Sequence, residues 1–147
     1  MKSYEVNGMK NKVLALDTNI FIYHFESNPQ YIPFTSAIFT SFVKAANRGI
    51  TSIISVLEVL SYPAPEKLIK EREDDFKTLP HFTVYDINHK IGLEAARLRR
   101  EYKIRLPDAI QLATAIYGKA DVFITNDAKI RNFNEVKVIL LEEVTKT

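Results

Sequence analysis

The sequence predicts an α/β fold of three layers (α/β/α), in which a central parallel sheet of about five strands has helices on both faces. Short apolar segments rich in β-branched and aromatic residues alternate with longer segments of helical spacing, and this alternation is typical of parallel sheets. The strand candidates are Val13 to Leu16, Thr51 to Ile54, Thr83 to Tyr85, Val122 to Thr125 and Val136 to Leu140. A chain of 147 residues fits one ordinary domain, so we expect an N-terminal extension over residues 1–11 and a single domain over residues 12–147.

The first long helical segment is predicted after Pro33, because proline favours the first turn of a helix. Apolar or small residues then recur at helical spacing: Phe34, Ala37, Ile38, Ser41, Phe42 and Ala45. This spacing indicates an amphipathic helix, and Gly49 is expected to end it. Phe39 falls off the apolar stripe, so we hypothesise that it lies at a contact between two copies of the chain.

Three further helices are predicted downstream. Pro63 and Pro65 open a segment whose charged side is expected to face water. Its apolar side carries Leu68, Ile69, Arg72, Phe76 and Leu79. Asn88 is suited to cap the next helix, and Pro107 begins the last one, which Gly118 is expected to end.

The composition favours a globular protein without disulfides or a membrane segment. The chain has no cysteine, which excludes thiolate zinc sites and cysteine nucleophiles, and its three histidines show no metal-binding spacing. Apolar stretches are interrupted by charged residues, and the N-terminus lacks the pattern of a signal peptide, so we expect a cytoplasmic protein. Met9 stands just before the first strand, which raises the hypothesis that residues 1–8 are dispensable.

Four acidic residues each have an ordinary structural explanation. Asp17 follows a strand and can cap a helix, while Glu58 follows Ser55 at the spacing of a capping box. Asp108 would stand in a first helical turn, where the helix dipole favours negative charge, and Asp127 can close a turn after a strand.

Their joint placement points to a second role. Asp17, Glu58 and Asp127 fall at or just after the carboxyl ends of predicted strands and Asp108 opens a helix, and ligands of open α/β sheets bind at that edge. Carboxylates gathered there would repel one another by about 3 kcal/mol per pair at ~5 Å. A hard cation removes that repulsion, and oxygen-only ligands suit Mg²⁺ or Mn²⁺, one or two ions of which can activate water and stabilise a phosphodiester under attack.

Four segments of the chain carry a family resemblance: LDTNI at 16–20, SVLEVL at 55–60, LPDAIQLATA at 106–115 and ITND at 124–127. They resemble the PIN domain family, and among its members the VapC toxins of toxin–antitoxin pairs look most similar. It covers the chain from about Val13 to Leu141.

The resemblance implies that Asp17, Glu58, Asp108 and Asp127 bind Mg²⁺ or Mn²⁺, with Asn19 and Thr125 in support. It also implies an RNA-cleaving enzyme with a central parallel sheet. VapC-like members commonly form homodimers and are inhibited by a protein antitoxin that covers the active site. We therefore expect a metal-dependent endoribonuclease that is the toxin of a type II toxin–antitoxin pair.

The distribution of basic residues fits a polyanionic substrate such as RNA. Without the four acids of the candidate site, 20 basic residues stand against 14 acidic ones. The candidate phosphate-binding residues flank the site segments: Arg99, Arg100, Lys103, Arg105, Lys129 and Arg131.

Other functions fit less well or remain open. A phosphatase of the haloacid dehalogenase type would carry a second aspartate where this chain has Asn19, and a phosphorylated receiver domain would need paired acids at the end of the first strand. The open alternatives are a PIN-type nuclease that processes RNA or cuts DNA without an antitoxin, and a non-catalytic PIN-like binding module.

Overall fold

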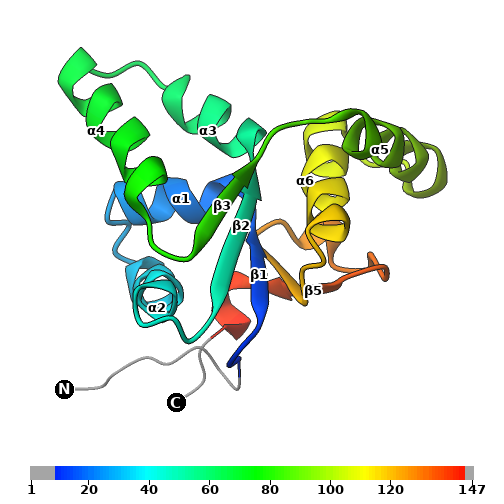
Figure 1. Cartoon of the computed structure of the whole chain (residues 1–147), viewed down its shortest axis with the longest axis horizontal. Coiled ribbons are helices and arrows are strands. Elements are labelled where there is room, and N and C mark those ends of the chain that lie inside the picture. The colour runs from blue at the N-terminus through cyan, green and yellow to red at the C-terminus, as the bar shows by residue number, and fades with distance from the viewer. Residues whose placement is uncertain (1–8, 145–147) are drawn as a thin grey trace.

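Five parallel strands form a single central sheet in the order β3-β2-β1-β4-β5 (Figure 1). The computed structural model describes residues 9–144. The strands are β1 (Val13–Leu16), β2 (Arg48–Ser52), β3 (Phe82–Tyr85), β4 (Val122–Thr125) and β5 (Lys137–Leu140). Every neighbouring pair is parallel, which confirms the predicted sheet.

Helices cover both faces of this sheet, so the fold has the predicted three layers (Figure 1). One face carries α1 (Thr18–Phe25), α2 (Ile32–Val43), α3 (Ile53–Leu60) and α4 (Glu66–Thr78). The opposite face carries α5 (His89–Tyr102) and α6 (Leu106–Tyr117). Two 3₁₀ turns, η1 (Ala128–Ile130) and η2 (Leu141–Glu143), flank β5.

The alternation of side chains along the strands produces two separate cores. Leu14 and Leu16 of β1 point to the α1–α4 side, where they join a cluster rich in phenylalanine. Ala15 of β1 and Phe123 of β4 point the other way, into the cluster under α5 and α6. Successive side chains of a strand face opposite sides of a sheet, so each central strand is buried on both faces.

The boundaries of the second strand were predicted wrongly. The strand spans Arg48–Ser52, and Ile53 and Ile54 begin α3. Ser52 ends the strand by capping this helix, since its side chain accepts the Ile54 N–H at 3.1 Å. Short β-branched segments do not distinguish strand from buried helix by periodicity alone, which explains the error.

Two expectations about the region of α2 are also wrong. The helix ends at Val43, and Gly49 lies inside β2, where a Cβ atom would stand 2.5 Å from the ring of Phe82. Phe39 is buried, with its ring 5.6 Å from Phe21 and 4.3 Å from His24. Because its surroundings belong to its own chain, Phe39 is not an exposed residue available for a dimer contact.

The structure confirms the predicted start of α5 and both predicted ends of α6. The Asn88 side chain accepts the Ile91 N–H at 2.9 Å and caps α5, Pro107 lies in the first turn of α6, and Gly118 is its C-cap. No helix within residues 9–144 has both the length and the apolar character that crossing a membrane requires. The hypothesis about residues 1–8 concerns a segment outside the described residues.

Candidate active site

The candidate site lies where the order of the strands reverses. From β1 the chain moves outward through β2 to β3, then returns to the other side of β1 with β4 and continues outward to β5. In open parallel sheets, the crevice at the carboxyl ends of the strands beside such a reversal is the usual ligand-binding position. Asp17 directly follows β1, and Asp127 stands two residues after β4.

Asp17 is buried and held by two hydrogen bonds. Its Oδ1 accepts the Thr18 N–H at 2.8 Å, so it caps α1 as predicted, and its Oδ2 accepts the hydroxyl of Thr125 at 2.7 Å. Burial raises the pKa of Asp17 to about 6, the two hydrogen bonds oppose this rise, and the charges of Asp108 and Glu58 add to it. Asp17 is therefore costly to ionise without a nearby positive charge.

Glu58 reaches the site from the second turn of α3. The predicted capping box is wrong, because Ser52 caps this helix and Ser55 is buried inside it. The carboxylate of Glu58 instead accepts the hydroxyl of Thr18 at 2.8 Å. A side-chain donor from α1 thus orients an acid from α3.

Asp108 occupies the first turn of α6, as predicted, and its side chain is only 12% exposed. Arg105 lies 3.3 Å away (Nε to Oδ2). The Arg105 side chain is 73% exposed, so solvent screens this contact and it contributes little to stability. Arg105 is nevertheless a cation at the rim of the site.

Asp127 caps the 3₁₀ turn η1, because its Oδ1 accepts the Lys129 N–H at 2.9 Å. Its own N–H donates to the Thr125 hydroxyl at 3.0 Å. Thr125 therefore connects Asp17 with Asp127.

One pocket of about 220 Å³ brings all four acids together. Its lining residues are Asp17, Thr18, Asn19, Ile22, Glu58, Arg105, Pro107, Asp108, Gln111 and Asp127. Among the described residues, no three histidine, aspartate or glutamate side chains form a ready-made metal cluster. An ion in this pocket would therefore be held by one or two carboxylates together with water, which is the usual coordination of Mg²⁺ in proteins.

The chemistry of the pocket fits such an ion. Its charged donors are carboxylates, which are the ligands that Mg²⁺ and Mn²⁺ prefer. Asn19 also lines it, and its Oδ1 is buried without a hydrogen-bond partner within residues 9–144. A buried acceptor of this kind is expected to be satisfied by water or a ligand.

Behind the pocket lies a chain of buried polar contacts. Gln111 of α6 donates through Nε2 to the hydroxyls of Ser55 at 2.7 Å and Thr18 at 3.1 Å. Thr51 of β2 lies 2.8 Å from Ser55 (Oγ1 to Oγ). Gln111 is not among the residues predicted for the site, although an amide among the apolar residues of LPDAIQLATA is an available signal.

The predicted phosphate-binding residues are dispersed. Arg105 lines the pocket and Lys129 lies just beyond Asp127, whereas Arg131 pairs with Glu143 at 3.1 Å. Arg100 lines a different pocket, of about 490 Å³, on α5 and α6. Arg99 belongs to the last turn of α5, and Lys103 is its C-cap. The structure places only Arg105 of this set in the lining of the acidic pocket.

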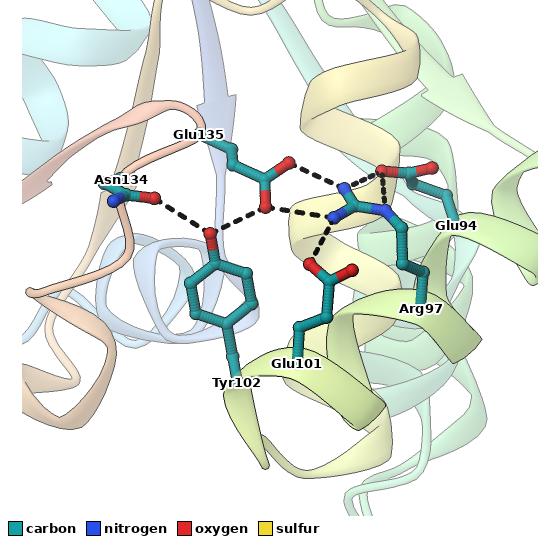
Figure 2. A network of polar contacts seen from close by, with 6 residues as sticks. All are labelled: Glu94, Arg97, Glu101, Tyr102, Asn134 and Glu135. Carbon is teal, nitrogen blue, oxygen red and sulfur yellow. Dashed lines mark hydrogen bonds and ion pairs between the residues drawn. The ribbon is translucent and has the colours of Figure 1, made fainter.

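Arg97, on the same helix, is engaged elsewhere. Figure 2 shows its guanidinium surrounded by Glu94, Glu101 and Glu135, with the hydroxyl of Tyr102 donating to Glu135 at 2.7 Å. These contacts fasten α5 to the loop before β5. They leave Arg97 without free donors facing a substrate.

Comparison with known proteins identifies the fold family. The model of the PIN domain matches residues 14–136. The chain belongs to the PIN domain family. PIN domains are generally nucleases, and membership rules out the phosphatase and receiver interpretations.

Solved structures of toxin–antitoxin complexes share the fold of this PIN domain. VapBC2 from Rickettsia felis, bound to a promoter DNA fragment, matches with TM-score 0.70 and 20% identity over 87% of this chain and 98% of that chain. A toxin–antitoxin complex from Klebsiella pneumoniae matches with TM-score 0.64 and 27% identity over 89% and 99%. DNA-bound VapBC from Salmonella typhimurium matches with TM-score 0.67 and 18% identity over 89% and 98%. No curated protein matches the chain.

Proposed function

We propose that this PIN domain is a Mg²⁺- or Mn²⁺-dependent endoribonuclease and the toxin of a type II toxin–antitoxin pair, acting in the cytoplasm. The supporting observation is that four acids from four separate segments line one pocket at the reversal point of the sheet. The complexes from Rickettsia felis and Klebsiella pneumoniae support the toxin assignment.

The proposed mechanism gives each carboxylate a task. Asp17, Glu58, Asp108 and Asp127 would together hold the metal, one or two of them directly and the others through water, and the metal would supply activation of water and charge stabilisation at the phosphodiester. Thr125 and the Thr18 N–H keep Asp17 in one rotamer. Arg105, at the rim, attracts the phosphate backbone and lies beside Asp108. The remaining candidate cations, Lys129 foremost, would bind phosphates further along the RNA.

The test is Asp108→Asn, which removes a ligand charge and almost no volume. We expect this variant to lose Mg²⁺- or Mn²⁺-dependent cleavage of single-stranded RNA by roughly 100-fold or more while its circular dichroism and melting temperature stay close to those of the wild type. Full activity of the variant, or of the wild type in EDTA, contradicts the mechanism. Cleavage of DNA in place of RNA would favour a different PIN nuclease task, and binding without cleavage a non-catalytic module.

An apolar pocket offers a place for the proposed antitoxin. About 580 Å³ in volume, it lies among α1, α2 and α4. Its lining residues include Phe21, His24, Phe25, Phe39, Val43 and Phe76. Aromatic pockets with a polar rim are typical anchor points of protein interfaces.

We also propose a homodimer, although not through Phe39. Leu93 and Tyr117 are 60% and 42% exposed and line the pocket on α5 and α6, which offers an apolar surface for a second copy. Sedimentation of Leu93→Lys against the wild type tests this. An unchanged monomer–dimer equilibrium would exclude this surface.

A further inference from the structure

Gln111 is a buried amide in an otherwise apolar stretch of α6. It is 2% exposed and stands one turn after Asp108, on the same side of the helix. Burying an amide costs free energy unless its donors are paired. The question is therefore what the two N–H groups of Gln111 accomplish.

The hydrogen bonds around Gln111 admit one consistent direction. Its amide nitrogen has two hydrogens, and both find acceptors, the hydroxyls of Thr18 and Ser55. A hydroxyl has only one hydrogen to give. That of Thr18 goes to Glu58 at 2.8 Å, because the carboxylate is a closer and stronger acceptor than Ser55 at 3.3 Å.

The hydrogen bonds of Ser55 and Thr51 also have one consistent direction. Thr51 donates its hydroxyl hydrogen to the carbonyl of Leu16 at 2.8 Å. Ser55 must then donate to Thr51, at 2.8 Å, and accept from Gln111. If the amide were flipped, its oxygen would face two hydroxyls whose only hydrogens are already used. The Glu58 carboxylate and the Leu16 carbonyl, which can only accept, thus set the direction of the network, and Gln111 supplies the donors that the Thr18 and Ser55 hydroxyl oxygens still accept.

We propose that Gln111 is a positioning residue for the metal site, which holds the Glu58 carboxylate toward the acidic pocket by fixing the position of the Thr18 hydroxyl that donates to it. This inference rests on the proposed function. Thr18 and Glu58 both line the pocket, and within residues 9–144 Glu58 is the one acid of the four that neither accepts a backbone N–H nor stands at the N-terminus of a helix or 3₁₀ turn. Outer residues that orient metal ligands typically change metal affinity by about 10- to 100-fold.

The first experiment measures Mn²⁺ binding by calorimetry. Gln111→Met and Thr18→Val remove the donors at similar volume, and we expect each to weaken Mn²⁺ binding by about 10-fold or more. Thr18→Ser keeps the hydroxyl and should stay within about threefold of the wild type. Thr114→Val is the matched control, since Thr114 is equally buried on α6 but its hydroxyl bonds only the Ile110 carbonyl.

The second experiment needs no metal. Urea unfolding in EDTA is measured for Gln111→Met, Glu58→Gln and the double variant. If the two residues are coupled, the change in the equilibrium constant of unfolding in the double variant should differ by about threefold or more from the product of the changes in the two single variants. If Gln111→Met does not fold, the same cycle with Thr18→Val replaces it.

The two proposals fail in different ways. A wild type that neither binds Mn²⁺ nor cleaves RNA overturns the proposed function and, with it, the role of Gln111. A wild type that binds and cleaves, together with Gln111→Met and Thr18→Val variants of unchanged affinity, overturns the inference alone. Additive effects in EDTA also overturn it.

Discussion

Replacing Asp17 with asparagine should stabilise the metal-free protein at neutral pH, although it removes a candidate metal ligand. Burial raises the pKa of Asp17 from 3.8 to about 6. At about 1.4 kcal/mol per unit, keeping this carboxylate ionised in the folded state costs about 3 kcal/mol at neutral pH. Asparagine keeps one oxygen to cap α1 but loses an acceptor for Thr125, at about 1 kcal/mol. The expected net gain is about 1–2 kcal/mol.

The dependence of this gain on pH gives the decisive check. An acid whose pKa is higher in the folded state destabilises the fold fully above that pKa and not at all below the unfolded value. The advantage of Asp17→Asn should therefore be complete above about pH 6 and vanish toward about pH 4.

Urea unfolding in EDTA at about pH 7.5 and about pH 4.5 measures this dependence. Asp121→Asn is the control, because Asp121 is an exposed acid that accepts the Val13 N–H away from the acidic pocket. If Asp17→Asn is less stable than the wild type at the higher pH, or its effect does not change with pH, the account of the buried charge is wrong.

Four further substitutions test the fold and the proposed partner surface. Gly49→Ala should destabilise the protein by about 1–3 kcal/mol, because the new Cβ meets the ring of Phe82. Gly92→Ala should stabilise the protein by about 0.5–1 kcal/mol, because the new Cβ in α5 meets nothing. Urea unfolding of both variants measures the sign of each effect. Arg97→Met leaves three glutamates unneutralised, so its melting temperature should fall by a few degrees at low salt and less at high salt. Val43→Asp changes an exposed residue of the apolar pocket and should weaken antitoxin binding by about 10-fold or more, which a pull-down assay measures. A nuclease assay of the variant without antitoxin should show unchanged RNA cleavage. Retained antitoxin binding excludes that pocket.

The sequence was most informative where local chemistry and burial agree. The structure has Val13–Leu16 and Val122–Thr125 as strands residue for residue, because both are short segments made almost entirely of apolar residues and buried on two faces. Asn88 and Gly118 likewise mark helix ends through chemistry that acts over a few residues. Prediction failed at Ile53 and Ile54, since only Ser52, by capping α3, decides between a longer strand and a helix.

Long-range contacts could not be predicted. That Phe39 is buried depends on rings from α1, and the partners of Gln111 come from α1 and α3, over 50 residues away in sequence. The rule that ligands bind at the carboxyl ends of parallel strands was enough to predict that the acids lie at one edge of the sheet. It could not predict which groups donate hydrogen bonds to each carboxylate.

The four acids differ in how the fold holds them, and this difference has a physical consequence. Asp17 and Asp127 accept backbone N–H groups, and Asp108 stands at the positive end of α6, so the backbone of three segments favours negative charge in the pocket. Glu58, in the last turn of α3, has no such support and depends on Thr18, which in turn depends on Gln111. Backbone caps persist as long as the helices do, whereas a chain of side-chain hydrogen bonds is lost with one substitution. The orientation of Glu58 is thus the feature of the pocket most easily removed without changing the fold.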